Sequence, residues 1–312
     1  MAPLSALIHP DLKIHSYGSY LRRRFGCRVS KVNVDAGFTC PNRDGSKGTG
    51  GCIYCNNVSF SPRDTLAEIP LEEQLAHGMS YHRLRLGSQK FIVYFQKYTN
   101  TYASVDLLKA LYRRALEYPD VVGISVGTRP DSLTDEAIRL LAEISSTHYV
   151  CLELGLQSMD DAILSRINRG HTLDEFLGAV GRASGNGFDI CAHLIYGFPG
   201  ETPDGFLKTA DLIASLPVDS VKLHQLHAVA GTELAAMYHR GEFVPVSLEE
   251  YVGVAADFLE RIPDRVTIQR LYGSAPLEIC VAPRWGLKNN RMWYAVINEL
   301  LRRNSWQGSR CR

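Results

Sequence analysis

Short apolar runs rich in β-branched residues alternate along this chain with longer segments in which apolar positions recur every three or four residues. The first pattern predicts buried strands, and the second predicts amphipathic helices. The predicted strands are Ser30–Val34, Lys90–Phe95, Val121–Val126, Tyr149–Leu154, Phe188–Ile195 and Ser220–Leu226. The predicted helices lie near residues 71–85, 104–116, 134–144, 159–167, 174–185 and 203–215. This succession of strand-then-helix units predicts an α/β fold with a parallel sheet and right-handed crossovers.

Two of the predicted helix starts carry the sequence pattern of a capping box. Thr172 is followed three residues later by Glu175, and Ser247 is followed in the same way by Glu250. In this pattern the hydroxyl and the carboxylate each accept a backbone N–H that the first turn of a helix leaves without a partner. We therefore expect helices to begin directly after Thr172 and Ser247.

The repeating pattern ends at about Ser247. A helix is predicted from there to about Arg261, then a strand at Val266–Arg270, a connector rich in Gly and Pro, and a last helix near residues 288–303. We interpret residues 247–312 as an extension appended to the main α/β unit.

Polar residues gather directly after the predicted strands. In a parallel sheet the carboxyl ends of the strands share one edge, where functional residues collect. The polar segments at these ends are Gln96-Lys97, Gly127 to Asp131, Gly155 to Ser158, Gly197 to Glu201 and His227 to Thr232. A cysteine-containing loop follows the first strand, so the sequence predicts one site that draws on all of these segments.

The composition is that of a globular protein that can bury a full core, with 312 residues of which 45% are hydrophobic. No apolar run approaches the roughly 20 residues that span a bilayer, so we expect no membrane partner. The segment Met1–His9 is too short and uncharged for a secretory signal, which favours a cytoplasmic protein.

Net charge of +1 conceals an uneven distribution. Residues 1–31 and 284–312 together carry +11, and the middle of the chain carries −10. Such segregation allows a basic surface for a polyanion such as RNA. The alternative is that the terminal arginines are simply solvated.

Three of the eight cysteines, Cys40, Cys52 and Cys55, lie in one glycine-rich loop. In a reducing compartment, clustered cysteines more often bind metal than form disulfides. A four-iron cluster normally takes four thiolates, so three leave one iron open to a small molecule. The alternative is a zinc site, for which the fourth ligand is poorly supplied: Cys27 precedes a strand, and the loop contains no histidine.

Several motifs together carry a resemblance to a known family. They are the cysteine loop, Thr128 to Asp131, Glu153 to Ser158, and His193 to Thr202. With these motifs the chain resembles the radical S-adenosylmethionine (SAM) superfamily, and within it the YtqA/YhcC group, relatives of the Elongator-type catalytic subunit. The resemblance implies a partial (β/α)6 TIM-type barrel with a small C-terminal α/β extension. The implied domains are an N-terminal basic segment (1–29), the barrel (30–246) and the extension (247–312).

The resemblance also implies two cofactors, a [4Fe–4S] cluster and SAM, and the residues that bind them. Cys40, Cys52 and Cys55 would hold the cluster, and Tyr54 would pack on the adenine of SAM. The remaining residues expected to contact SAM are Gln96, Thr128, Gln157, Arg169 and His193. Gly127 stands where related enzymes often have a glutamate, so Thr128 or another group would have to recognise the ribose.

Each of these SAM contacts has a structural alternative. Gln157 is also an ordinary turn residue, and Arg169 could simply close a helix. A lone strand histidine such as His193 is often a core residue. On the last predicted strand, alternation puts His224 and His227 on opposite faces, and His227 is a weaker candidate for a substrate contact.

The function implied by the resemblance is reductive cleavage of SAM to a deoxyadenosyl radical that modifies transfer RNA. The expected change converts the wobble-uridine side chain from carboxymethylaminomethyl toward aminomethyl. An external one-electron donor such as flavodoxin or ferredoxin is implied as a partner beside tRNA. Two alternatives remain open at this point: radical oxidation of a small molecule such as a tetrapyrrole, and a metal-containing RNA-binding module without catalysis.

Overall fold

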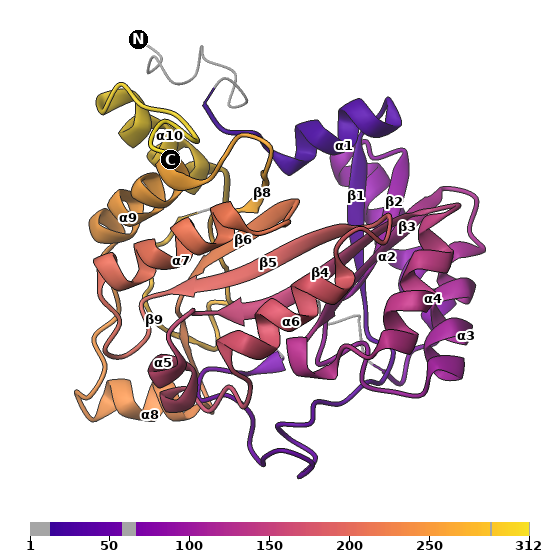
Figure 1. Cartoon of the computed structure of the whole chain (residues 1–312), viewed down its shortest axis with the longest axis horizontal. Helices are drawn as coiled ribbons and strands as arrows, with labels where there is room; N and C mark the ends of the chain where they lie inside the picture. The colour runs from indigo at the N-terminus through magenta and orange to yellow at the C-terminus, as the bar shows by residue number, and fades with distance from the viewer. Residues whose placement is uncertain (1–12, 58–66, 288, 312) are drawn as a thin grey trace.

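The computed structural model describes residues 13–57, 67–287 and 289–311. Its main feature is a curved sheet in the order β1-β2-β3-β4-β5-β6-β8, in which every neighbouring pair is parallel. The strands are β1 (Val29–Val34), β2 (Lys90–Phe95), β3 (Val121–Thr128), β4 (Tyr149–Gln157), β5 (Asp189–Tyr196), β6 (Ser220–Gln225) and β8 (Thr267–Arg270). Figure 1 shows the sheet curling with helices around it, which is the partial barrel predicted from the sequence.

Helices connect and cover these strands (Figure 1). They are α1 (Tyr17–Phe25), α2 (Leu71–Leu86), α3 (Val105–Leu116), α4 (Asp135–Ser145), α5 (Asp161–Arg166), α6 (Leu173–Ala183), α7 (Pro203–Ser215), α8 (Glu233–His239), α9 (Leu248–Arg261) and α10 (Asn289–Arg302), with a 3₁₀ turn η4 (Pro130–Ser132). A second, antiparallel pair joins β7 (Ala228–Val229) to β9 (Cys280–Ala282). Of these elements, α1, α8, β7 and β9 were not predicted.

Both bonds of the predicted capping box form at Thr172, whereas only one of the two forms at Ser247. Thr172 and Glu175 form both bonds of a capping box at α6. At α9, Ser247 accepts the Glu250 N–H, but the Glu250 carboxylate accepts the Tyr196 hydroxyl at 2.7 Å instead. The Glu250 carboxylate thus links α9 to the end of β5 and does not cap the first turn of α9.

The C-terminal extension contributes a strand to the main sheet. The strand predicted at Val266–Arg270 is β8, and it pairs in parallel with β6. Ser16 in turn forms a bridge to Ile268 of β8. The barrel sheet therefore has seven strands, one more than the sequence pattern indicated, because the seventh follows a long connection instead of a regular crossover.

The basic ends of the chain meet, at the amino ends of the strands. Lys13 Nζ donates to the carbonyl of Ser305, and the Gln307 N–H donates to the carbonyl of Lys13. The α1 helix, with its exposed arginines, lies nearby, where Tyr20 donates to Asp189 at the start of β5. Predictions about Met1–His9 lie outside the described residues. Across the described ranges, no helix has the length and apolar character needed to span a membrane.

The aromatic contact between α7 and α9 generates a stability prediction. Phe206 and Phe258 are fully buried and their rings stack with centroids 5.7 Å apart. We expect Phe258→Ala to lower the free energy of unfolding by about 3–5 kcal/mol, because it leaves a cavity between barrel and extension. Urea denaturation measures this, with Leu84→Ala, at an 84% exposed position, as the control. A loss below about 1 kcal/mol, or separate transitions for the two regions, would contradict the shared core.

Candidate active site

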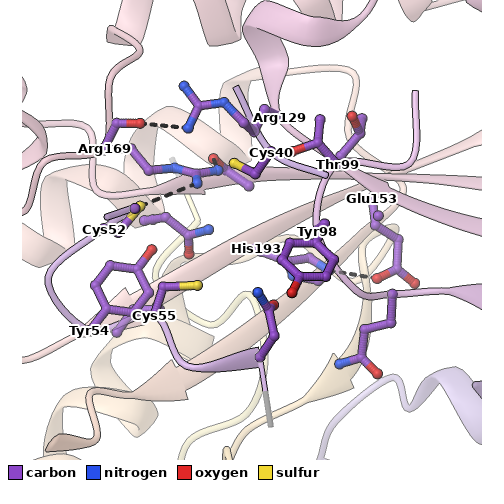
Figure 2. A pocket seen from close by; sticks show the side chains of 18 of the residues that line it. Cys40, Cys52, Tyr54, Cys55, Tyr98, Thr99, Arg129, Glu153, Arg169 and His193 are labelled. Carbon is purple, nitrogen blue, oxygen red and sulfur yellow. Dashed lines mark hydrogen bonds and ion pairs between the residues drawn. The ribbon is translucent and has the colours of Figure 1, made fainter. Parts of the chain in front are cut away.

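A cavity of about 180 Å³ lies at the carboxyl ends of the strands, and all nine site residues predicted from the sequence line it. Figure 2 shows cysteines toward one side of this pocket and Glu153 with His193 toward the other. The predicted residues that line it are Cys40, Cys52, Tyr54, Cys55, Gln96, Thr128, Gln157, Arg169 and His193. Side chains far apart in the sequence thus meet because parallel strands share their carboxyl edge.

The cysteine loop is held in place by backbone bonds to itself and to the end of α5. Cys40 accepts the Asp44 N–H, Cys52 accepts the Cys55 N–H at 2.9 Å, and Ile53 donates to the Ile167 carbonyl at 3.0 Å. Cys52 is buried, whereas the other two cysteines are half-buried. Within the described residues, no three His, Cys, Asp or Glu side chains are already grouped closely enough to hold a metal ion.

The surroundings of the cysteines suit metal-bound thiolates. Arg169 Nη1 and Asn42 Nδ2 each lie 3.8 Å from Cys52 Sγ as donors. Arg43 donates to the carbonyl of Cys55 at 2.6 Å. Cations and N–H donors stabilise thiolates, and they tune the potential of an iron–sulfur cluster when directed at its sulfurs. Three thiols with these neighbours fit a [4Fe–4S] cluster bound by the chain.

Arg169 joins the cysteine loop to β4. Its Nη2 donates to the Gly155 carbonyl and its Nε to His171, both at 2.9 Å, while Nη1 faces Cys52 (Figure 2). A Cβ at Gly155 would stand 2.6 Å from Arg169 Nη2, so any larger residue here would push the guanidinium from its present position. Arg169 is therefore fixed in the pocket wall by hydrogen bonds, and it does more than close a helix.

The Thr128 to Asp131 turn fixes the backbone of Arg169 through Arg129. Arg129, which is 2% exposed, donates through Nη1 to the Arg169 carbonyl at 2.7 Å. Its other nitrogens form a two-bond pair with Asp131, at 2.9 and 2.8 Å. Planar pairing of this kind fixes direction as well as distance. Arg129 positions the pocket, a role that sequence reasoning did not assign to it.

Gln157 has an unusual backbone conformation. It ends β4 with φ of 74°, and the register between β4 and β5 shifts between Gly155 and Gln157. Left-handed φ is uncommon for residues other than glycine and concentrates at functional sites, as bulges do. The shift turns the Gln157 side chain onto the pocket wall instead of leaving it in a solvent-exposed turn.

The other predicted residues occupy distinct parts of the pocket wall. Tyr54 is buried, with its ring centroid 5.5 Å from that of Phe198. Gln96 accepts from Asn33 Nδ2 at 2.7 Å, and the Thr128 hydroxyl lies 2.6 Å from that of Thr101. Tyr54 therefore offers an aromatic surface, whereas Gln96 and Thr128 offer polar groups that are already partly satisfied.

A single buried carboxylate, Glu153 of β4, organises the interior of the barrel. Each of the other five strands among β1 to β6 contributes one side chain that contacts Glu153. These partners are Lys31 on β1, Tyr94 on β2, Ser125 on β3, His193 on β5 and Lys222 on β6. The predicted residue His193 thus holds its place in the pocket through Nε2, which lies 2.6 Å from Glu153.

Burial and charge together set the ionisation of this network. Burial disfavours the Glu153 carboxylate, but Lys222 and Lys31 outweigh it and hold the Glu153 pKa well below its usual value. Burial lowers the pKa of Lys222 to about 8, although Glu153 opposes this. Burial and the charge of Lys222 lower the pKa of His193 to about 4. At neutral pH, Glu153 is ionised and His193 is neutral.

The two histidines of β6 and its exit share a small cavity, but only one of them lines the cysteine pocket. His224 lines both cavities, whereas His227 lines only the smaller one, 3.1 Å from Gln225 Nε2. The weaker candidate His227 is thus displaced from the pocket, because the strand ends at Gln225 and alternation stops there.

Sequence reasoning missed the charged residues of the barrel interior. Lys31, Glu153 and Lys222 each interrupt an apolar strand. Charged residues are almost never fully buried unless paired, so charges inside predicted buried strands are a usable signal of mutual pairing.

Comparisons with known proteins show which family the chain belongs to. The profile of the Radical SAM superfamily matches residues 43–213, and that of the Radical_SAM C-terminal domain matches residues 218–302. YtqA of Bacillus subtilis is 36% identical over 301 residues, 96% of this chain and 92% of YtqA. A tRNA uridine(34) acetyltransferase of Methanocaldococcus infernus is 28% identical over 194 residues, 61% of this chain but 34% of that protein.

The solved structure of archaeal Elp3 from Methanocaldococcus infernus, lacking its N-terminus, superposes with a TM-score of 0.68 at 20% identity. The match covers 89% of this chain and 64% of that one, and at this identity it supports the fold alone. The superfamily profile covers more than half of the chain, and YtqA aligns over nearly all of it. The chain therefore belongs to the radical SAM superfamily, in the YtqA/YhcC group, and its cofactors are a [4Fe–4S] cluster and SAM.

Proposed function

We propose that this radical SAM enzyme modifies the wobble uridine of tRNA, acting on a carboxymethylaminomethyl side chain to leave an aminomethyl type. The observation that carries the catalytic part is the convergence of three cysteines and Arg169 on one cavity at the strand ends. When bound, the cluster and SAM supply one-electron chemistry that removes hydrogen from a substrate. An external donor such as flavodoxin or ferredoxin would deliver the electron, in the cytoplasm where tRNA is found.

The nine site residues predicted from the sequence each have a role in this proposal. Cys40, Cys52 and Cys55 would hold the cluster, and Tyr54 would pack on the adenine. Arg169 would pair with the SAM carboxylate, for which its planar fork is suited. The polar side chains for the rest of SAM are Gln96, Thr128, Gln157 and His193.

Two observations support tRNA as the substrate: the name of a relative, and an exposed aromatic ring at the pocket mouth. The 28% identical relative is named for acting on uridine 34 of tRNA. At the mouth, Tyr98 lines the pocket, is 37% exposed and has φ of 62°. An exposed ring held in this conformation offers a base-stacking surface. The basic chain ends lie at the opposite end of the strands, so this proposal does not depend on them.

The experiment that tests the function is nucleoside mass spectrometry of tRNA from cells with and without the gene. We expect the carboxymethylaminomethyl nucleoside to accumulate, and the aminomethyl type to fall, when the gene is absent. An unchanged nucleoside profile would contradict the tRNA substrate and favour a small molecule such as a tetrapyrrole. SAM cleavage would be unaffected by that outcome.

The cluster assignment predicts the behaviour of Cys52→Ala. Removing one of three thiolates should abolish both the visible absorption of the reconstituted cluster and SAM cleavage. Cys311→Ala is the matched control, because Cys311 is exposed and outside the pocket. Retained turnover in Cys52→Ala would contradict the ligand assignment, and a colourless wild-type protein with tightly bound zinc would favour the non-catalytic module.

The stacking role predicts a separation of two activities in Tyr98→Ala. Conversion of a tRNA substrate should fall about tenfold or more, since stacking on an aromatic side chain contributes about 1–3 kcal/mol per base. Substrate-free SAM cleavage should change less than twofold. Tyr98→Phe, which keeps the ring, should retain conversion. Equal loss of both activities in Tyr98→Ala would show that Tyr98 supports the cofactor site and not the RNA.

A further inference from the structure

Positive charge is concentrated at the inner end of the pocket, where β6 meets β8. Lys222 and Arg270 are register partners in this parallel pair. Neighbouring residues on adjacent strands point to the same face, and His224 lies two residues further along β6, also on that face. Like charges placed side by side on a sheet destabilise it. This arrangement therefore calls for a negative group between or beside the two cations.

Among the described residues that line the pocket, one carboxylate lies here, and it pairs with Lys222 but forms no ion pair with Arg270. Glu153 contacts Lys222, Lys31, His193, Tyr94 and Ser125. Two lysines thus already share its single charge. In the described part of the chain, the Arg270 guanidinium forms neither a hydrogen bond nor an ion pair, although it lines the pocket. The inner end of the pocket is left with excess positive charge.

His224 has an unused hydrogen-bonding atom at the same place. Its Nε2 is buried, and no described residue partners it. Its ring lies parallel to that of His193, with centroids 6.3 Å apart. Burial and the charge of Arg270 hold the His224 pKa well below its ordinary value, so the imidazole is neutral and able to donate one N–H. Buried polar atoms without a partner cost free energy unless a ligand supplies one.

Three cavities converge on these residues. Lys222 and Arg270 line the cysteine pocket and also a second cavity of about 550 Å³ between α1, α2 and β8. Arg270 and His224 also line the small cavity that contains His227. A substituent that enters past the cysteines can therefore reach Arg270.

We propose that Arg270 and His224, beside Lys222, bind the carboxylate of the substrate that reacts in this pocket. A carboxylate matches the planar fork of Arg270 and accepts the N–H of His224. The inference rests on the proposed function in one respect: the carboxymethylaminomethyl side chain ends in a carboxylate. SAM also carries a carboxylate, which the proposal assigns to Arg169 at the opposite side of the pocket.

The test compares two anticodon stem-loop RNAs with wild-type enzyme and Arg270→Gln. One RNA carries carboxymethylaminomethyluridine, and the other carries its neutral amide. For the carboxylate RNA, kcat/KM should fall 10- to 100-fold in Arg270→Gln, as expected when a charge-assisted bond of about 1.5–3 kcal/mol is lost. Conversion of the amide RNA, already poor, should change less than threefold. Arg270→Lys should recover part of the preference.

Controls separate this site from the SAM site. The SAM dissociation constant and substrate-free SAM cleavage should remain within threefold of wild type in Arg270→Gln. Arg139→Gln, at an exposed position on α4 where the arginine pairs with Glu136, is the matched control. A large rise in the SAM dissociation constant with the RNA preference intact would overturn the proposal and assign Arg270 to the SAM carboxylate.

A second measurement does not require RNA. N-ethylglycine at millimolar concentration should raise the melting temperature of the wild-type protein, whereas N-ethylglycinamide should not, and Arg270→Gln should respond to neither. Without ligand, Arg270→Gln should melt at the wild-type temperature or above, because an uncompensated cation is removed. If the RNAs are not converted but this pattern appears, the tRNA proposal fails and the carboxylate site stands. If wild type and Arg270→Gln respond alike, the carboxylate site is refuted.

Discussion

The fold depends on one buried negative charge. The Glu153 side chain is fully buried. Its carboxylate, on β4, contacts one side chain from each of β1, β2, β3, β5 and β6. Through Lys31, which also donates to Gln269 at 2.8 Å, the network reaches β8. A buried ion pair adds little net stability compared with apolar packing, but removing one partner leaves a costly unpaired charge. The network therefore acts mainly to specify how the curved sheet closes around a polar interior.

That polar interior explains why the pocket can serve radical chemistry. The cysteines, Arg169 and Tyr54 lie at the rim, whereas Glu153, Lys222 and Arg270 lie deeper in the barrel. A cofactor held by the cysteines would thus face the charged side chains of the barrel interior. Arg129 links the two regions indirectly, because it fixes the backbone of Arg169 and is itself fixed by Asp131. The same side chains that stabilise the fold also define what the pocket can bind.

The apolar runs were sufficient to predict the first six strands and their shared carboxyl edge, because strands of a parallel sheet are buried on both faces. The residues expected to contact SAM came from the resemblance to the radical SAM superfamily, and they line the pocket together with the three cysteines. Arg129 and the Glu153 network were missed, since partners such as Lys31 and Lys222 are identified only when strand register is known. Arg270 illustrates the limit most clearly. Its strand was predicted, but as part of an appended extension, and only pairing with β6 places it against Lys222. The bonds of Arg169 likewise depend on the close approach of Gly155, which no local pattern predicts.

We infer that three cysteines of this chain hold a cluster with one iron left open for SAM. Electron paramagnetic resonance of the anaerobically reconstituted, reduced wild-type protein tests it most directly. We expect a [4Fe–4S] signal that changes on addition of SAM, together with formation of 5′-deoxyadenosine. A cluster signal that is indifferent to SAM, or a protein that retains zinc and gives no signal, would contradict it.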